Sequence, residues 1–195
     1  MRIIGGKFKG KKLILPIDNK TRPLRDIVKE SIFNLITHSK KIKTNMACSY
    51  VLDLFSGSGS FGIECISRDA KKVFFCENYF LALKILKKNL SSLKEVNNYQ
   101  IFEENCLSFF FSNKKLNYKF NIIFIDPPFN EIKINQILNL IIEKNILDNN
   151  GLIILHRHKN DKIEITKNLD IIETKIYGTS KIIFLKNFKN LSKSS

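Results

Sequence analysis

The stretch VLDLFSGSGSFGIE, residues 51–64, carries the clearest structural signal in this chain of 195 residues. A strand-like apolar run that contains Asp53 leads into GSGSFG (57–62), a GxGxxG pattern, and then into a helix. Glycines at these positions permit a tight turn and let the backbone N–H groups at the start of the helix approach a ligand closely. Twenty residues after Gly57, Glu77 ends the next strand, where a carboxylate can accept hydrogen bonds from both hydroxyls of a ribose. The stretch therefore predicts a nucleoside-binding turn.

Strand and helix signals alternate over most of the remaining chain. Short, nearly continuous apolar runs are typical of parallel strands buried on both faces, and they occupy residues 49–55, 71–77, 99–104, 120–126 and 152–158. Between them lie stretches with helical periodicity, at residues 62–68, 80–93 and 134–144. This alternation predicts βαβ units and a doubly wound sheet.

The end of the chain follows a different pattern. Two strand-like runs, residues 169–176 and 181–185, are joined by the turn sequence YGTS (177–180), which predicts a hairpin. The preceding connection, residues 158–168, is too short and too polar for a full helix. We therefore predict an α/β, Rossmann-like fold, in which a mostly parallel seven-stranded sheet is closed by an antiparallel C-terminal hairpin.

The N-terminal residues form an appendage to this sheet. Residues 1–15 predict a small β-hairpin around the glycines at positions 5, 6 and 10. TRP (21–23) then opens a helix that runs to about Thr37, and its expected buried side consists of Ile27, Val28, Ile32 or Ser31, Leu35 and Ile36. We therefore divide the chain into a basic arm and helix that face RNA (1–45), a main domain (46–188) and a frayed tail (189–195).

The charge of the chain favours a polyanionic partner. Lysine and arginine outnumber aspartate and glutamate by 33 to 18, a formal net charge of +15, although AT-rich coding would also produce many lysines. The distribution is more informative, because three of the five arginines lie within residues 1–25 and a planar guanidinium suits phosphate. We predict that nucleic acid is bound there by Arg2, Lys7, Lys9, Lys11, Arg22 and Arg25.

Two features favour S-adenosylmethionine over a dinucleotide as the ligand of the glycine turn. Asp53 would face the positive ammonium and sulfonium groups, whereas it would repel a pyrophosphate. The closing hairpin also departs from the dinucleotide-binding pattern. Asn105, at the end of the third strand, is placed to hydrogen-bond an adenine edge, although asparagine is also a common turn residue there. The predicted cofactor-binding residues are Asp53, Phe55, Ser56, Gly57, Gly59, Glu77, Asn78, Asn105, Cys106 and Asp126.

A second motif, IIFIDPPFN (122–130), indicates the chemistry. Its two prolines hold the loop extended and remove two amide donors, so the Asp126 carboxylate and the proline carbonyls are expected to be free acceptors. An exocyclic nucleobase amine that donates both protons, to Asp126 and to the Pro127 carbonyl, would expose its lone pair to a methyl group. Phe129 would stack on a base that has left its helix or loop. The predicted catalytic residues are Asp126, Pro127, Pro128 and Phe129.

Other classes of site have less support. The four cysteines lie far apart without a CxxC pair, which disfavours zinc and disulfide frameworks. His156 and His158 would share one face of a strand, and we expect a solvated strand end there rather than a metal pair, so no metal is predicted. The apolar runs are shorter than a membrane span and the N-terminus lacks the apolar core of a secretory signal. We therefore expect a cytoplasmic, monomeric protein.

Five stretches taken together resemble the RsmD-type guanine-N2 methyltransferases of small-subunit ribosomal RNA. They are RIIGGKFKGKKL (2–13), TRPLRDIVKESIFNLI (21–36), VLDLFSGSGSFGIE (51–64), FFCEN (74–78) and IIFIDPPF (122–129). The resemblance implies a class I methyltransferase fold. It also implies metal-free methyl transfer from S-adenosylmethionine to the 2-amino group of one guanine, of the 966 type, in 16S rRNA. The implied substrate is the small ribosomal subunit rather than a short free RNA.

The resemblance also implies roles for individual positions. Asp53, Gly57 and Gly59 would line the methionine side, Asn105 would lie beside the adenine and Glu77 at the ribose. The guanine would face residues 126–129, and the RNA would contact Arg22 and Arg25. The chain departs from the family pattern after the RP pair, where Leu24 and Arg25 replace small hydroxyl residues. It departs again after the fifth strand, where His156 and His158 stand in place of acids.

Three alternatives to this interpretation stay open. An adenine-N6 methyltransferase of RNA or DNA would also act on an exocyclic amine, but such enzymes more often carry Asn before the proline pair and Tyr after it. A non-catalytic ribosome assembly factor that binds S-adenosylmethionine would have no need of the DPPF loop. A nicotinamide-dependent oxidoreductase would use the same glycine turn. Asp126 and Phe129 favour guanine among these choices.

Overall fold

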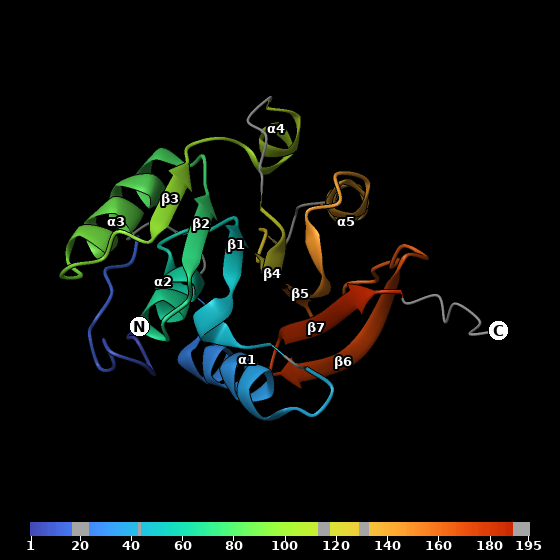
Figure 1. Cartoon of the computed structure of the whole chain (residues 1–195), viewed down its shortest axis with the longest axis horizontal. Coiled ribbons are helices and arrows are strands. Elements are labelled where there is room, and N and C mark those ends of the chain that lie inside the picture. Colours follow the sequence, from blue (N-terminus) through green and yellow to red (C-terminus); the bar gives the residue numbers. More distant parts are fainter. Residues whose placement is uncertain (17–23, 43, 113–117, 129–132, 189–195) are drawn as a thin grey trace.

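A single seven-stranded sheet forms the centre of the computed structural model, which describes residues 1–16, 24–42, 44–112, 118–128 and 133–188 (Figure 1). The strand order is β3-β2-β1-β4-β5-β7-β6. The strands are β1 (Tyr50–Leu54), β2 (Lys72–Cys76), β3 (Tyr99–Phe102), β4 (Phe120–Ile125), β5 (Leu147–His158), β6 (Leu169–Tyr177) and β7 (Ser180–Asn187). The first five pair in parallel, and β7 runs antiparallel between β5 and β6. The predicted Rossmann-like sheet with its closing hairpin is confirmed.

Strand β5 begins five residues earlier than the sequence pattern indicated. The segment DNNG (148–151) is polar and lies outside the apolar run that predicted the strand, yet it belongs to the strand. Pairing starts with Leu147 opposite Phe120 and is followed by a register shift before Ile122 meets Leu152. Such an irregularity allows a strand to include several polar residues before its apolar run begins.

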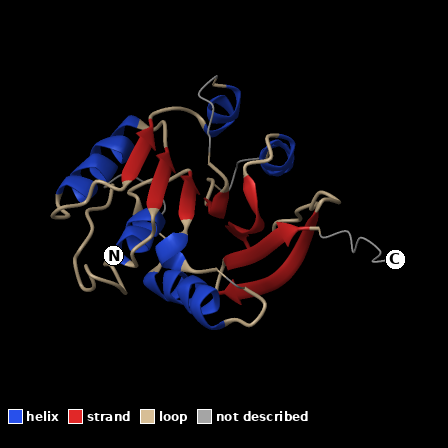
Figure 2. Ribbon diagram, viewed as in Figure 1, coloured by secondary structure: helices blue, strands red, loops and turns tan. Residues whose placement is uncertain are grey.

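Helices cover both faces of the sheet (Figure 2). One face carries α1 (Asp26–His38), α2 (Ser60–Ser67) and α3 (Phe80–Ser91), and the other carries α4 (Cys106–Phe111) and α5 (Ile134–Glu143). A 3-10 turn, η1 (Met46–Cys48), precedes β1. Helix α4 was not predicted, because its sequence CLSFFF has the aromatic content of a strand. None of the helices in the described ranges is long and apolar enough to cross a membrane.

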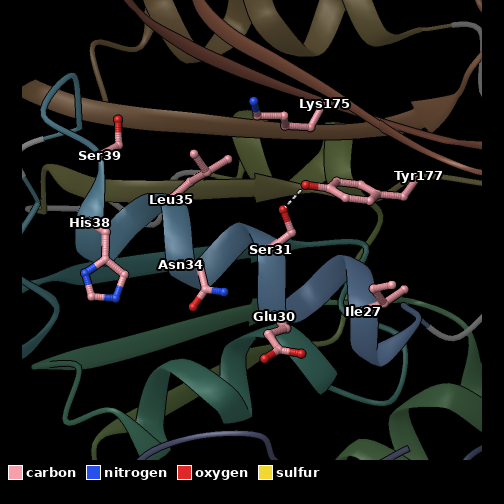
Figure 3. Close-up of a pocket in the computed structure, with 9 residues that line it drawn as sticks. All are labelled: Ile27, Glu30, Ser31, Asn34, Leu35, His38, Ser39, Lys175 and Tyr177. Atoms are coloured by element: carbon pink, nitrogen blue, oxygen red, sulfur yellow. Dashed lines mark hydrogen bonds between the residues drawn. The ribbon is translucent and has the colours of Figure 1, made fainter.

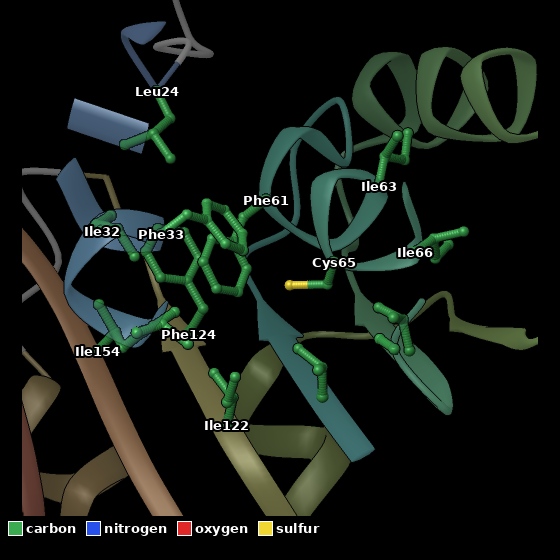
Figure 4. Packing of buried hydrophobic residues seen from close by; sticks show 14 of the residues in the cluster. Leu24, Ile32, Phe33, Phe61, Ile63, Cys65, Ile66, Ile122, Phe124 and Ile154 are labelled. Atoms are coloured by element: carbon green, nitrogen blue, oxygen red, sulfur yellow. The ribbon is translucent and has the colours of Figure 1, made fainter. Parts of the chain in front are cut away.

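Three stacked aromatic rings join helix α1 to the sheet (Figure 4). The ring of Phe33 lies 5.3 Å from that of Phe61 on α2, which in turn lies 4.0 Å from that of Phe124 on β4, measured between centroids. The buried side of α1 therefore includes Phe33, whereas Ile27, expected there, is 62% exposed. The helix is rotated so that its Phe33 side, rather than its Ile27 side, faces the sheet.

The N-terminal arm lies along α2 and α3. An isolated antiparallel bridge pairs Arg2 with Lys12, and three backbone hydrogen bonds join the two halves of the arm, so the expected β-hairpin is present in a short and irregular form. The donors are the N–H groups of Ile3, Gly10 and Leu13, and the acceptors are the carbonyls of Lys11, Ile3 and Met1 respectively. Other backbone groups of the arm bind the helices, as when Lys7 N–H donates to the Ser67 carbonyl. Pairing within the arm and contacts with α2 and α3 therefore set its conformation together.

Candidate functional site

The loops that follow β1, β2 and β4 meet at one edge of the sheet. Leu54 pairs with Cys76 on one side and with Ile125 on the other, so the three strands end at the same level. Two backbone contacts continue this alignment into the loops, from Asp126 N–H to the Leu54 carbonyl and from Ser56 N–H to the Cys76 carbonyl. The two predicted motifs are therefore adjacent, at the carboxyl edge where α/β sheets bind ligands.

The three glycines of the turn differ in what surrounds them. A Cβ atom on Gly59 would lie 2.4 Å from Leu86 Cδ1, and one on Gly62 would lie 2.2 Å from Phe75 Cε1. These two glycines therefore allow α2 to pack closely against α3 and β2. Gly57 has a φ of +56°, and a Cβ atom there would meet nothing within 4 Å. Gly57 is thus the position where the backbone faces open space and a ligand can approach.

Asp53 lies beneath the turn. Its side chain is buried, and Oδ2 accepts a hydrogen bond of 2.9 Å from Gly62 N–H. Burial raises the pKa of Asp53 well above its ordinary value, the Gly62 hydrogen bond opposes this shift, and the charges of Asp126 and Glu77 add to it. The carboxylate therefore supports the start of α2 and contributes a nearby negative potential, rather than an exposed ligand group.

Glu77 accepts backbone hydrogen bonds that connect β2 to the glycine turn. Its Oε2 accepts from Gly57 N–H, and its Oε1 accepts from the N–H groups of Asn78 and Tyr79, all at 2.8 Å. Ser56 is also held, since its Oγ donates to the Asp53 carbonyl at 2.7 Å. The predicted ribose-binding carboxylate thus has a fixed orientation next to Gly57.

Two residues of β5 contact the DPP loop. His156 Nδ1 lies 2.7 Å from Asp126 Oδ1, and Arg157 Nη1 donates to the Pro128 carbonyl at 3.1 Å. The Pro128 carbonyl and one oxygen of Asp126 are therefore engaged, which corrects the expectation that all the loop acceptors are free. The Asp126 side chain keeps 18% exposure. Phe129 lies outside the described residues.

His156 is buried, with 3% of its surface exposed, so the expected solvated strand end is wrong at this position. The burial follows from the position of β5 between β4 and β7, which encloses the end of the strand. Sequence reasoning missed His156 and Arg157 as site residues. The sheet order of the predicted fold could have indicated them. Strand β5 lies next to β4, so the polar residues at the end of β5 lie beside Asp126.

The remaining predicted cofactor residues lie around this edge. Asn105 is exposed, and its Oδ1 accepts from Leu107 N–H at 2.9 Å, so it caps α4, which is the turn role that asparagine commonly takes. Cys106 is buried and Asn78 is exposed, while Phe55 is half-buried with a φ of +60°. No group of three His, Cys, Asp or Glu side chains in the described parts of the chain could hold a metal.

The predicted RNA-binding residues are spread over two regions. Lys7 and Lys9 are exposed at the tip of the arm, beside Ser67 at the end of α2 and therefore toward the amino edge of the sheet. Arg2 is exposed as well, and the amine of Lys11 donates to the Ser92 carbonyl. Arg25 lies at the carboxyl edge, where Nη2 donates to the Tyr177 carbonyl at 2.7 Å. Arg22 lies outside the described residues.

A groove of about 700 Å³ separates α1 from β6 near Arg25 (Figure 3). The hydroxyls of Ser31 on α1 and Tyr177 on β6 are in contact across it. Tyr177 pairs with Ser180, which pairs with His158 at the end of β5, so this part of the groove reaches the carboxyl edge. The exposed Ile27 lines the groove, which the sequence did not indicate.

Comparisons with known proteins give consistent similarities. A family model described as "Conserved hypothetical protein 95" matches residues 1–186. A Haemophilus influenzae protein named ribosomal RNA small subunit methyltransferase D is 34% identical over 91% of this chain and 89% of its own length. The protein of that name from Escherichia coli K12 is 31% identical over 91% of this chain and 85% of its own. The solved Escherichia coli protein yhhF matches with a TM-score of 0.81 at 28% identity, covering 96% of this chain and 97% of its own.

Proposed function

Because the chain belongs to the RsmD-type family of methyltransferases, we propose that it methylates the exocyclic 2-amino group of one guanine in 16S ribosomal RNA. One observation carries the proposal: the partly exposed Asp126 carboxylate and the open side of Gly57 follow two paired strands, β4 and β1, that end at the same edge of the sheet. An acceptor for an amine and a backbone that a nucleoside can approach are thus at one edge. This is the arrangement that methyl transfer to a nucleobase amine requires.

The residues present suit S-adenosylmethionine as the methyl donor. Gly57 leaves room for it, Glu77 is oriented beside that space, and the acidic side chains of the buried Asp53 and the partly exposed Asp126 favour a cation. When bound, the cofactor supplies an electrophilic methyl group. A dinucleotide would bring its negative pyrophosphate to the same acids, which disfavours the oxidoreductase alternative.

The catalytic contribution of the protein comes from positioning. Asp126 accepts a hydrogen bond from one N–H of the guanine amine and the Pro127 carbonyl accepts a hydrogen bond from the other, which leaves the nitrogen lone pair directed at the donor. After transfer the nitrogen sheds one proton, to water or to Asp126. Phe129 stacks on the flipped base in this proposal. No strong base is required, because the methyl donor is already activated.

The RNA-facing surface in this proposal comprises Arg25, Arg22 and the exposed basic residues of the arm. Arg25 lies at the same edge of the sheet as Asp126. Lys7 and Lys9 lie toward the opposite edge and would contact more distant RNA of a large particle. We therefore propose the small ribosomal subunit as substrate, with the protein acting as a cytoplasmic monomer and residues 1–45 as its RNA-binding appendage.

A tritium-methyl transfer assay tests the proposal. Purified small subunits that lack the modification, free 16S rRNA and DNA would be offered in parallel, followed by digestion to nucleosides. We expect label in N2-methylguanosine from the subunit. Label in methyladenosine would overturn the guanine assignment, and binding of the cofactor without transfer to any substrate would favour an assembly factor.

A further inference from the structure

We propose that His156 is a positioning residue for catalysis, which acts by fixing the Asp126 carboxylate through a hydrogen bond from its Nδ1–H. This inference rests on the proposed methyl transfer and adds a residue to it. The observation behind it is the 2.7 Å contact between His156 Nδ1 and Asp126 Oδ1, made by a histidine with only 3% exposure.

Backbone contacts hold the DPP loop but do not restrain rotation of the Asp126 side chain. Its backbone is held by Asp126 N–H on the Leu54 carbonyl and by the Arg157 guanidinium on the Pro128 carbonyl. Arg157 is itself buried and paired with Asp161, since its Nε lies 2.8 Å from Asp161 Oδ2. What remains is rotation of the Asp126 carboxyl group about its own side-chain bonds. Rotation of a carboxylate between equivalent positions is a motion that a single hydrogen bond can stop.

The contact with His156 assigns different roles to the two carboxylate oxygens. Oδ1 accepts from the imidazole, which leaves Oδ2 to accept from the amine of the base. Pairing of β5 with β4 and β7 fixes the backbone of His156, and the burial of the side chain restricts rotation of the imidazole. A bound amine therefore meets an acceptor already held in place, and the protein avoids the cost of ordering it during the reaction.

His158 offers a matched control two residues along the same strand. Its imidazole is half-buried, and its Nδ1 accepts from Asn160 N–H at 3.3 Å. The same substitution at His158 therefore removes an imidazole from the end of β5 while leaving the hydrogen bond between His156 and Asp126 intact. A loss of activity specific to position 156 would separate positioning of the carboxylate from general disturbance of the strand.

The kinetic test compares three variants with the wild type on small subunits. We expect His156→Leu, which keeps volume but loses the donor, to lower kcat by about tenfold or more, with the KM for S-adenosylmethionine nearly unchanged. His156→Asn places an amide donor near the former Nδ1 and should restore most of the rate. His158→Leu should behave as the wild type does. Equal activity of the Leu and Asn variants at position 156 would overturn the inference.

A second measurement does not depend on turnover. Long-range proton–nitrogen NMR of the histidine rings should show a proton on Nδ1 of His156, and Asp126→Asn should shift that signal. A His156 ring without a proton on Nδ1 in the wild type would overturn the inference, whatever the substrate proves to be. Wild-type protein that labels no guanine would instead overturn the proposed function, so the two failures are distinguishable.

Discussion

At the level of single residues, Asp126 is the group on which the proposed chemistry depends. It is partly exposed, and no arginine or lysine of the described ranges lies at salt-bridge distance from it, so its role is to accept hydrogen bonds rather than to stabilise the fold. We expect Asp126→Ala to abolish methyl transfer while the affinity for S-adenosylmethionine stays within about tenfold. Calorimetric titration beside the transfer assay measures both, and retained turnover would contradict this role.

Gly6 allows the arm to lie against α2. Its φ is +74°, and a Cβ atom there would lie 1.7 Å from the Ser67 carbonyl oxygen. Gly6→Ala should therefore reduce the free energy of unfolding by more than about 2 kcal/mol, because strain and a backbone clash add. Gly10→Ala is the control, since Gly10 has a φ of +89° but no atom near such a Cβ, and only the conformational cost of about 1 kcal/mol applies. Urea unfolding of both variants would test this, and equal losses would argue against the clash.

At the level of elements, the joint between the arm, α1 and α2 is built around a buried glutamate. Glu64 accepts from the N–H groups of Ile4 and Gly5 at 2.8 Å and from Arg68 Nε at 2.9 Å, and its Oε2 lies 3.6 Å from Lys29 Nζ. Burial lowers the pKa of Lys29, and the charges of Glu64 and Asp26 oppose that shift. Three segments thus converge on one carboxylate.

Removing the charge of Glu64 should destabilise this joint strongly. Glu64→Gln keeps the size of the side chain but leaves the buried Lys29 ammonium without its main counter-charge, so we expect a loss of about 3–5 kcal/mol in the free energy of unfolding. Glu173→Gln removes a surface partner of Lys41 and Lys175 and should change stability little. Thermal and urea unfolding would measure the difference, and similar stability of the two variants would contradict the buried-pair argument.

The glycine turn couples cofactor binding to a proton. Burial raises the pKa of Asp53 above its ordinary value in the free protein, so Asp53 binds a proton more readily there than an exposed aspartate does. A cation bound nearby favours the ionised form and lowers that pKa, so binding should release up to about one proton at pH values between the two pKa values. In that window the affinity for S-adenosylmethionine should rise with pH. Calorimetry in buffers of different ionisation enthalpy would detect the release, and a heat independent of the buffer would contradict it.

At the level of the whole molecule, positive charge is spread from the arm to the carboxyl edge of the sheet. Arg2 and Arg25 are exposed on these two regions. Reversing both charges should weaken RNA binding and reduce the slope of log affinity against log salt by about 0.7–0.9 for each phosphate that the protein no longer neutralises. A Lys144→Glu change, at the end of α5 on the other face, provides a control for net charge. An unchanged slope in the double variant would remove these arginines from the RNA interface.

Local patterns in the sequence were sufficient for much of this architecture. Each strand is recognised by its apolar run and the glycine turn by its GxGxxG pattern, and both are local features of the sequence. These features predict the sheet and place the two motifs together at its carboxyl edge. The hairpin after β5 was predictable for the same reason, because the connection before it lacks the length for a helix.

Contacts between distant residues determined the rest. The burial of His156 and its bond to Asp126, 30 positions away, arise only once β4 and β5 are adjacent. The position of residues 1–16 on the fold depends on Glu64, which binds backbone groups about 60 positions earlier in the chain. The rotation of α1 depends on the ring stack through Phe61 and Phe124. Sequence periodicity shows which face of an element is apolar. It does not show which partner a buried polar group will bind, because the hydrogen bonds that replace its lost hydration form only in the assembled fold.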